Sequence, residues 1–498
     1  MLGLFSTKSN HPLADPKEAR VLLAELAASQ AAAGVEEATS WCESVAADEN
    51  LRLDRRIEIL LQLDETAVLH ARRTARDYLT SPRQGRAQEM RLWGVNHGYW
   101  ATLCAAYESC QARARAKEKG ADALKSHQAL LAARMLHAYA ALLKWDQFRY
   151  GPIDPRLWAS MGQVHLAAKA AKVSDKAVTL YAVGSIETTP EREYLKALAF
   201  HASSMDKLLP LEIEIAERLI AHFLPGFVFT DQARPDNVYW CDSAKPLPPT
   251  RLARLPEISP TLCFFSAGAA LGAAEALRQQ IDETKEVPAS LVLGGQYPPR
   301  VVLPVLTHLI ACWAPRPPMR THARHHVKSR LAVVHGIAGV HQRIAGGEGD
   351  FPDTESWVVD DVSIGGMGTQ VPLGPNDWIC IGSLLAIQPE GGNNWLVGIV
   401  RRFSRVSDKI GAVGLETVGR TPRAIVADSG GLKTDAILLE STLSLGGLAR
   451  VILPTAAWED FIPMVFEAEG KTIRLQPREI LETGAEFVVG SYRVEAIA

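Results

Sequence analysis

The chain has 498 residues, of which 47% are hydrophobic and 22% are charged, and its formal net charge at pH 7 is −3. This length predicts about two to four domains, and the apolar content is sufficient for well-buried cores. The near-neutral balance excludes an overall electrostatic footprint for nucleic acid or for an anionic membrane surface, so a basic patch must be a local feature.

The seven cysteines are scattered and odd in number, and no two of them form a Cys-x-x-Cys pair. This pattern predicts buried free thiols in a reducing compartment. The N-terminus lacks the basic start and long apolar core of a signal peptide. The most apolar run, residues 301–313, is interrupted by proline and histidine and is too short to span a bilayer. We therefore expect a cytoplasmic protein without membrane insertion.

Residues 1–224 form the first expected domain, because alanine and leucine recur there with helical periodicity between glycine and proline breaks. Helix starts are predicted at Asp154 before Pro155 and at Thr189 before Pro190. The pattern predicts an α-helical bundle. A repeat scaffold of the tetratricopeptide type, presenting a groove to a protein partner, is the alternative, although no fixed period persists over three units.

Residues 225–312 form an expected connecting region of mixed α/β character. Extended segments around a turn are predicted at 227–240, a proline-rich connection at 244–260 and a helix at 265–286. A second helix is predicted at 297–313, and it leads directly into a basic segment. The role of this region is not indicated by any motif.

The basic segment opens the third expected domain, residues 313–424, and contains Arg320 and Arg324 four positions apart. Two prolines just upstream favour a tether over the interior of a helix. Residues 326–336 alternate apolar with basic side chains and predict a strand. Two guanidinium groups are therefore expected directly before a sheet. Arg316 with Arg320 has the same spacing, but the later pair adjoins the strand.

A second motif, Asp-x-Ser-x-x-Gly, is formed by Asp361, Ser363 and Gly366 after another strand-like run. The carboxylate supplies acceptors for the donor edge of a guanine, the hydroxyl can donate to a phosphate, and the glycine allows close backbone approach. Arginine adds a planar cation that binds phosphate bidentately and stacks on a base. These residue types together fit a small guanine ligand with two phosphates.

The two motifs, in this order and followed by further strands, resemble the PilZ domain family over roughly residues 315–423. The resemblance implies a six-stranded antiparallel β-barrel that binds the bacterial second messenger cyclic di-GMP, with no other cofactor. It implies that Arg320 and Arg324 grip phosphate and stack on guanine, that Asp361 accepts from a guanine edge and that Ser363 contacts phosphate. Many members carry a further arginine where this chain has Met319, so the resemblance does not decide whether a site binds one ligand molecule or two.

Residues 425–498 form the last expected domain, because their apolar alternation predicts a small sheet or a second barrel. The fold class expected for the whole chain is therefore α+β and multidomain. A helical N-terminal domain precedes a PilZ-like barrel, and a β-rich C-terminal domain follows it.

The chemistry of the chain favours binding over catalysis. Five histidines near the arginines lack carboxylate or cysteine companions at metal-ligand spacing, so no metal site is predicted. Nucleophile-elbow, P-loop and zinc-protease motifs are also missing from the sequence. We expect a non-enzymatic cyclic di-GMP receptor in which ligand fixes the arginine tether and reorients a helical domain that binds an unknown protein.

Three alternatives remain, the weakest being an enzyme, which survives only because residues 225–312 are uninterpreted. In the first of the other two, the chain is a ligand-independent interaction scaffold with a degenerate barrel. In the second, the basic segment is a nucleic-acid surface, which the lack of interleaved aromatic residues and the acidic overall balance both disfavour.

Overall fold

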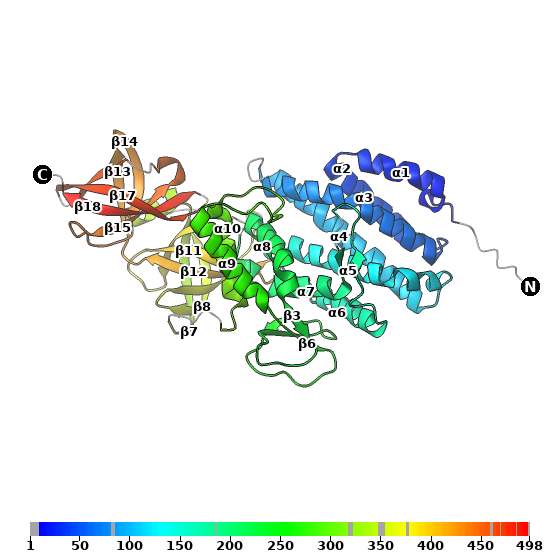
Figure 1. The fold of residues 1–498 in the computed structure, drawn as a ribbon. Coiled ribbons are helices and arrows are strands. Elements are labelled where there is room, and N and C mark those ends of the chain that lie inside the picture. Colours follow the sequence, from blue (N-terminus) through cyan, green and yellow to red (C-terminus); the bar gives the residue numbers. More distant parts are fainter. Residues whose placement is uncertain are drawn as a thin grey trace, which may run out of the picture. The chain divides into compact units, whose positions relative to one another are not determined.

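The computed structural model describes residues 9–80, 85–184, 187–316, 322–346, 354–374, 378–458, 462–468, 470–484 and 486–496. The chain divides into two compact units. The first consists of Met1–Arg149, Ile153–Met205 and Pro210–Pro318, and the second of Tyr150–Pro152, Asp206–Leu209 and Met319–Ala498. The first unit is mainly helical and the second is built on two β-barrels (Figure 1).

Helix α5 is the hub of the helical unit, since it contacts α3, α4, α6, α7 and α8. Its buried face carries several alanines, whose small side chains let neighbouring helices approach closely. The helices, coloured blue to green in Figure 1, are α1 (Pro16–Ala28), α2 (Ala31–Ala47), α3 (Leu53–Thr80), α4 (Arg86–Arg115), α5 (Leu124–Gln147), α6 (Pro155–Ala170), α7 (Pro190–Ala202) and α8 (Pro210–Phe223).

The two predicted helix starts are confirmed. The Asp154 carboxylate accepts a hydrogen bond from the backbone N–H of Arg156 at 2.9 Å, and the Thr189 hydroxyl accepts one from Arg192 at 3.1 Å. Proline occupies the first position of both α6 and α7. Side-chain acceptors therefore satisfy backbone donors that have no partner within the helix.

The connecting region completes the first unit with a four-stranded antiparallel sheet in the order β3-β6-β4-β5 and two helices. These elements are β3 (Val228–Thr230), β4 (Tyr239–Asp242), β5 (Thr250–Arg251), β6 (Leu262–Ser266), α9 (Ala269–Thr284) and α10 (Pro299–Trp313); a short ribbon, β1 (Val178–Thr179) with β2 (Glu187–Thr188), precedes α7. Both helices predicted here are found, although the first begins later than expected because its initial residues belong to β6. In the described residues, no helix has the length and apolar character of a membrane span.

The first barrel of the second unit is a closed antiparallel sheet in the order β10-β11-β12-β9-β8-β7, as the family resemblance implies. Its strands are β7 (His325–His335), β8 (Glu355–Ser363), β9 (Gly366–Pro372), β10 (Leu384–Pro389), β11 (Leu396–Arg405) and β12 (Ile410–Gly419). The strand predicted at residues 326–336 is thus confirmed as β7, which pairs with both β8 and β10.

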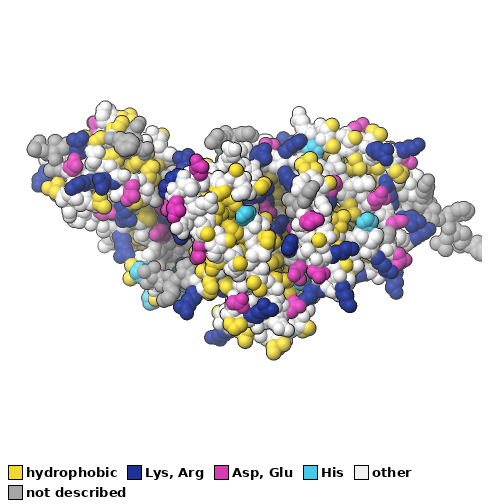
Figure 2. All heavy atoms as spheres, viewed as in Figure 1, with side chains coloured by type: hydrophobic (Ala, Val, Ile, Leu, Met, Phe, Trp, Pro, Cys, Tyr) yellow, Lys and Arg dark blue, Asp and Glu magenta, His cyan; other side chains and the backbone are white. Residues whose placement is uncertain are grey.

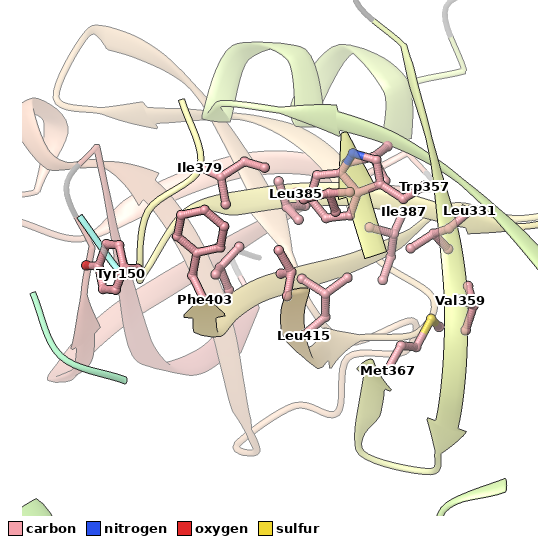
Figure 3. Packing of buried hydrophobic residues seen from close by; sticks show 14 residues of the cluster. Tyr150, Leu331, Trp357, Val359, Met367, Ile379, Leu385, Ile387, Phe403 and Leu415 are labelled. Carbon is pink, nitrogen blue, oxygen red and sulfur yellow. The ribbon is translucent and has the colours of Figure 1, made fainter. Parts of the chain in front are cut away.

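Alternating side chains fill the interior of this barrel (Figure 3). Leu331, Trp357 and Phe403 are each at most 1% exposed and pack together from different strands. Tyr150 belongs to the same cluster, with its ring 5.3 Å from the Phe403 ring, and its hydroxyl donates to the backbone oxygen of Leu208 at 3.1 Å. Aromatic rings of this size contribute large buried apolar areas, which stabilise a small barrel.

The second barrel repeats the topology of the first. Its closed order is β13-β14-β15-β18-β17-β16, so both barrels have the order 1-2-3-6-5-4 when their strands are numbered from one. Its strands are β13 (Arg423–Ser429), β14 (Leu432–Leu438), β15 (Leu448–Pro454), β16 (Met464–Ala468), β17 (Lys471–Thr483) and β18 (Phe487–Ala496). Of the two architectures considered for the C-terminal residues, a small sheet and a barrel, the barrel is found.

A second apolar cluster joins the two barrels within their unit. Val397 and Ile399 of the first barrel and Ile437 and Ile452 of the second are all fully buried in this cluster. Helix α11 (Ile337–Ile344), which the sequence analysis did not predict, lies between β7 and β8 and contacts β10, β13 and β14. On the face drawn in Figure 2, basic and acidic side chains are interspersed, in keeping with the small net charge.

Candidate functional site

The Asp-x-Ser-x-x-Gly motif forms the hairpin between β8 and β9. Ser363 pairs with Gly366 at the end of the ladder, and Asp361 pairs with Gly368. Ile364 and Gly365 are therefore the two connecting residues, as in the tight turns that join antiparallel strands. The spacing of the motif thus follows from a two-residue hairpin, which holds its carboxylate and its hydroxyl on one short segment.

Arg324 lies beside this hairpin because β7 begins at the next residue, His325, and pairs with β8. Its Nη1 donates to both Asp361 carboxylate oxygens, at 2.9 and 3.0 Å. The Arg324 side chain is 41% exposed and that of Asp361 is 19% exposed. Both halves of the predicted site therefore meet in one partly solvated ion pair, from residues 37 positions apart in the chain.

Close packing requires glycine at Gly366 of the hairpin and favours it at Gly368. A Cβ on Gly366 would lie 1.9 Å from the backbone oxygen of Leu415 in β12, which is not a possible contact. A Cβ on Gly368 would lie 3.0 Å from both carboxylate oxygens of Asp361, so its absence leaves room for that carboxylate. The motif glycine therefore supports the barrel, and Gly368 makes space for the ion pair.

The hydroxyl of Ser363 donates to the backbone oxygen of Gly366 at 3.2 Å. In this state its proton closes the hairpin, so a phosphate contact would require the hydroxyl to rotate. Arg320, the other predicted arginine, lies outside the described residues. Of the five predicted site residues, the structure brings together Arg324, Asp361, Ser363 and Gly366.

A further arginine at the hairpin was missed by the sequence analysis. Nη2 of Arg420 donates to the backbone oxygen of Ile364 at 2.6 Å, and the Arg420 backbone oxygen accepts from the Asn394 side chain at 2.8 Å. Arg420 lies in the short connection between β12 and β13, 56 residues after Ile364. Because only closure of the barrel brings this connection to the hairpin, no local spacing indicates it.

The histidines near the basic segment take separate structural positions. The His335 ring stacks on Trp378 with 4.0 Å between centroids, and Nε2 of His341 lies 3.1 Å from the backbone oxygen of Ile425. Among the described residues, no group of three or more His, Cys, Asp or Glu side chains is arranged to hold a metal ion. The seven cysteines are free thiols, and five of them are buried.

Comparison with known protein families finds a match in the helical half of the chain. No curated protein matches the sequence. Residues 17–234, which run from the second residue of α1 through β3, match the family described as the N-terminal domain of the cyclic-di-GMP receptor FimW. The match ends before the barrels, so the family assignment and the motifs of the β8–β9 hairpin come from separate parts of the chain. Residues 17–234 of this protein are therefore similar to the FimW N-terminal domain.

Proposed function

We propose that this protein is a cyclic di-GMP receptor whose binding site is the first barrel. The observation that carries the proposal is the contact between Arg324 and Asp361, at 2.9 Å, on a hairpin with the Asp-x-Ser-x-x-Gly pattern. A guanidinium and a carboxylate in contact are complementary to the two ends of a guanine nucleotide, since one binds phosphate and the other accepts from the guanine N–H groups. The family that matches residues 17–234 is described as part of a cyclic-di-GMP receptor, which supports the same ligand.

Ligand would replace the ion pair with contacts of its own. The guanine edge donates to Asp361, and Arg324, released from that carboxylate, turns to a phosphate while its plane stacks on the base. Arg320 adds the second guanidinium four residues earlier on the tether. Arg420 is already held by the hairpin, and its remaining N–H groups offer a third cationic contact.

Transmission follows from the position of the tether in the chain. The two arginines lie between the end of α10 at Trp313 and the start of β7 at His325. A ligand that holds both arginines against the barrel fixes this connection, and ordering of such a segment is a known type of switch. In this proposal the helical unit carries the output to a protein partner. The protein acts by binding, without catalysis.

Calorimetric titration of the full chain with cyclic di-GMP tests the proposal. Saturable binding is expected for the parent, with no heat from GTP at the same concentrations. The Arg320→Ala, Arg324→Ala double variant should lose binding. Lys328→Ala is the control, because Lys328 is an exposed cation on β7 and its removal takes one positive charge from the same region without touching the hairpin. The absence of heat for the parent would instead favour a ligand-independent scaffold.

A further inference from the structure

The helical unit contains a large cavity that the barrel site does not explain. Its volume is about 680 Å³, and it is lined by α3, α5, α7 and α8 together with residues 293–297. All of its lining residues belong to the first unit. Its volume falls in the range of small-molecule sites.

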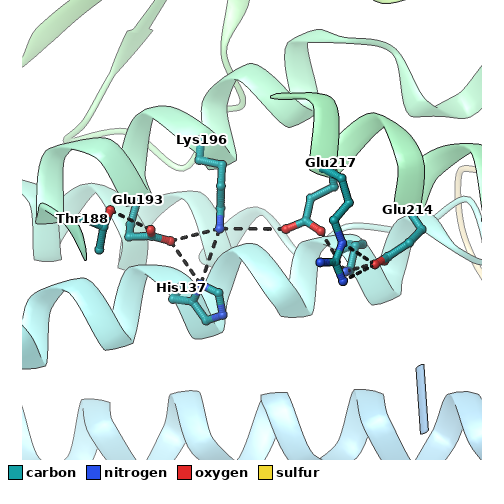
Figure 4. Close-up of polar contacts among 8 residues, drawn as sticks. His137, Thr188, Glu193, Lys196, Glu214 and Glu217 are labelled. Carbon is teal, nitrogen blue, oxygen red and sulfur yellow. Dashed lines mark hydrogen bonds and ion pairs between the residues drawn. The ribbon is translucent and has the colours of Figure 1, made fainter. Parts of the chain in front are cut away.

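One wall of the cavity carries a chain of buried charges from α5 and α7 (Figure 4). Glu193, which is 5% exposed, accepts from the Thr188 hydroxyl at 2.8 Å and lies 3.1 Å from both His137 and Lys196. Burial raises the pKa of Glu193, but the charge of Lys196 and the hydrogen bond from His137 outweigh it and lower this pKa to about 2. Burial, assisted by the charge of Lys196, lowers the pKa of His137. The carboxylate is therefore ionised at neutral pH and the imidazole is neutral.

The chain of charges continues onto α8 in the same view. Lys144 lies 2.7 Å from Glu214 and 3.0 Å from Glu217, and Glu214 also accepts from Arg218 at 2.9 Å. Lys196 lies 3.9 Å from Glu217, which links the two halves (Figure 4). Each of these carboxylates is thus already neutralised by a cation of the protein. The acidic groups of the wall are not available to an additional cation.

Three further arginines line the cavity without such a partner. Arg72, Arg76 and Arg192 are exposed, and within the described residues none of the three forms an ion pair. Nη2 of Arg76 donates to the backbone oxygen of Gly294 at 3.4 Å, and Arg72 lies 5.7 Å from the ring of Tyr181. The lining holds six Lys or Arg side chains and four Glu side chains, an excess of two positive charges. The uncompensated charge of the cavity is therefore positive and solvent-accessible.

The rest of the lining is apolar. It includes Leu79, Leu180 and Leu224 and the ring of Trp100, which come from separate segments of the chain. If an organic anion bound to the arginines, the rest of the molecule would contact these apolar side chains. Apolar walls with a small number of placed polar groups are typical of sites for organic ligands.

A second buried network in the same unit has a different character and serves as a comparison. The carboxylate of Asp64, fully buried, accepts from Tyr107 at 2.9 Å, from Tyr181 at 3.0 Å and from Arg134 at 3.0 Å. This network is closed by aromatic side chains and Asp64 does not line the large cavity. Arg134 lines a different cavity, but its guanidinium is paired with both Asp64 and Glu65. The lining of the large cavity, by contrast, includes three arginines that form no ion pair within the described residues.

We infer that this cavity is a second ligand site, separate from the barrel, for a small organic anion. The negative group of the ligand, a phosphate, sulfonate or carboxylate, contacts Arg72, Arg76 and Arg192, and its apolar part lies against the leucines and Trp100. The paired network of Glu193, Lys196 and Lys144 stays intact and forms one wall.

The dye 1-anilinonaphthalene-8-sulfonate tests this site, because it joins an anionic group to an apolar ring system and fluoresces in apolar surroundings. Its uncharged analogue, N-phenyl-1-naphthylamine, reports on the apolar part alone. For the Arg72→Gln, Arg76→Gln double variant of the full chain we expect about a threefold to twentyfold weaker binding of the sulfonate, since exposed ion pairs contribute little each. Binding of the uncharged dye should not change.

Two controls separate this site from the rest of the protein. Arg73→Gln removes an exposed charge from the same helix outside the cavity lining and should leave both dyes unaffected. Arg324→Ala, in the barrel, should also leave sulfonate binding unchanged, so failure here is distinguishable from failure of the barrel site. Far-ultraviolet circular dichroism checks that each variant retains its helices.

Competition then identifies the head group. Displacement of the sulfonate by GMP indicates a phosphate site, and displacement by decanoate indicates a carboxylate site; either supports the inference. Displacement by neither, or equal losses in the Arg73→Gln and Arg72→Gln, Arg76→Gln proteins, would overturn it.

Discussion

Replacing Arg324 with alanine changes the energy of both the free and the bound states of the barrel. In the free protein it removes the contacts to Asp361 at 2.9 and 3.0 Å. Both side chains are partly solvated, and such pairs contribute about 0.2–1 kcal/mol. In the complex proposed above it removes a charge-assisted contact to phosphate worth about 1.5–3 kcal/mol.

The net effect is the difference between these two terms. A ligand that binds the parent must first separate Arg324 from Asp361, whereas the alanine variant has no pair to break. The difference is about 0.5–3 kcal/mol, which corresponds to a loss of affinity of about twofold to a hundredfold. Isothermal titration calorimetry with cyclic di-GMP measures it directly.

The ion pair can be isolated by repeating the substitution in an Asp361→Asn background, where no pair must be broken. Removal of Arg324 should then weaken binding more than it does in the parent, by the same 0.2–1 kcal/mol or so. If the Arg324→Ala protein binds cyclic di-GMP as tightly as the parent, the arginine does not contact the ligand and the assignment of the site is wrong.

Three further outcomes are expected. Gly366→Ala should destabilise the barrel by about 1–3 kcal/mol, because its methyl group would overlap the backbone oxygen of Leu415. The control Gly365→Ala should change the stability little, because its methyl group would make only an ordinary contact at 3.6 Å. Hydrogen exchange of the β9 and β12 amides distinguishes the two variants. The pKa of Glu193 is depressed in the folded state, so ionised Glu193 contributes about 3 kcal/mol to the free energy of unfolding at pH values above its unfolded pKa near 4.5. This contribution is lost as the pH falls from 4.5 toward 2. Urea unfolding followed by circular dichroism at 222 nm should show this loss of stability in the parent and a smaller loss in Glu193→Gln. Arg420→Gln should weaken cyclic di-GMP binding severalfold while leaving the melting temperature nearly unchanged, and an unaltered affinity would restrict Arg420 to a structural role.

Local patterns predicted the elements that depend on neighbouring residues. Side-chain alternation identified β7, and capping residues followed by proline identified the starts of α6 and α7. The hairpin motif could be located because its geometry is set within six residues, Asp361 to Gly366. In each case the determining interactions span only a few positions of the chain.

Features that depend on tertiary closure could not be predicted. Helix α11 has only eight residues, which is too short for a clear periodic signal. Arg420 reaches the hairpin only when β12 returns beside β9. The cavity network joins His137 to Glu193 across 56 positions, and neither residue belongs to a recognisable motif. Such contacts are properties of the packed helices, and the sequence carries no local pattern for them.

The apolar cluster shared by the two barrels makes them one cooperative folding unit. Val397 and Ile399 point out of the first barrel and are nevertheless fully buried, because the second barrel covers them. A fragment ending at the first barrel would expose this face to water, and exposed apolar patches of this kind lead to self-association. Both barrels should therefore unfold in a single transition. The smallest fragment suitable for studying the hairpin in isolation therefore extends to the end of β18.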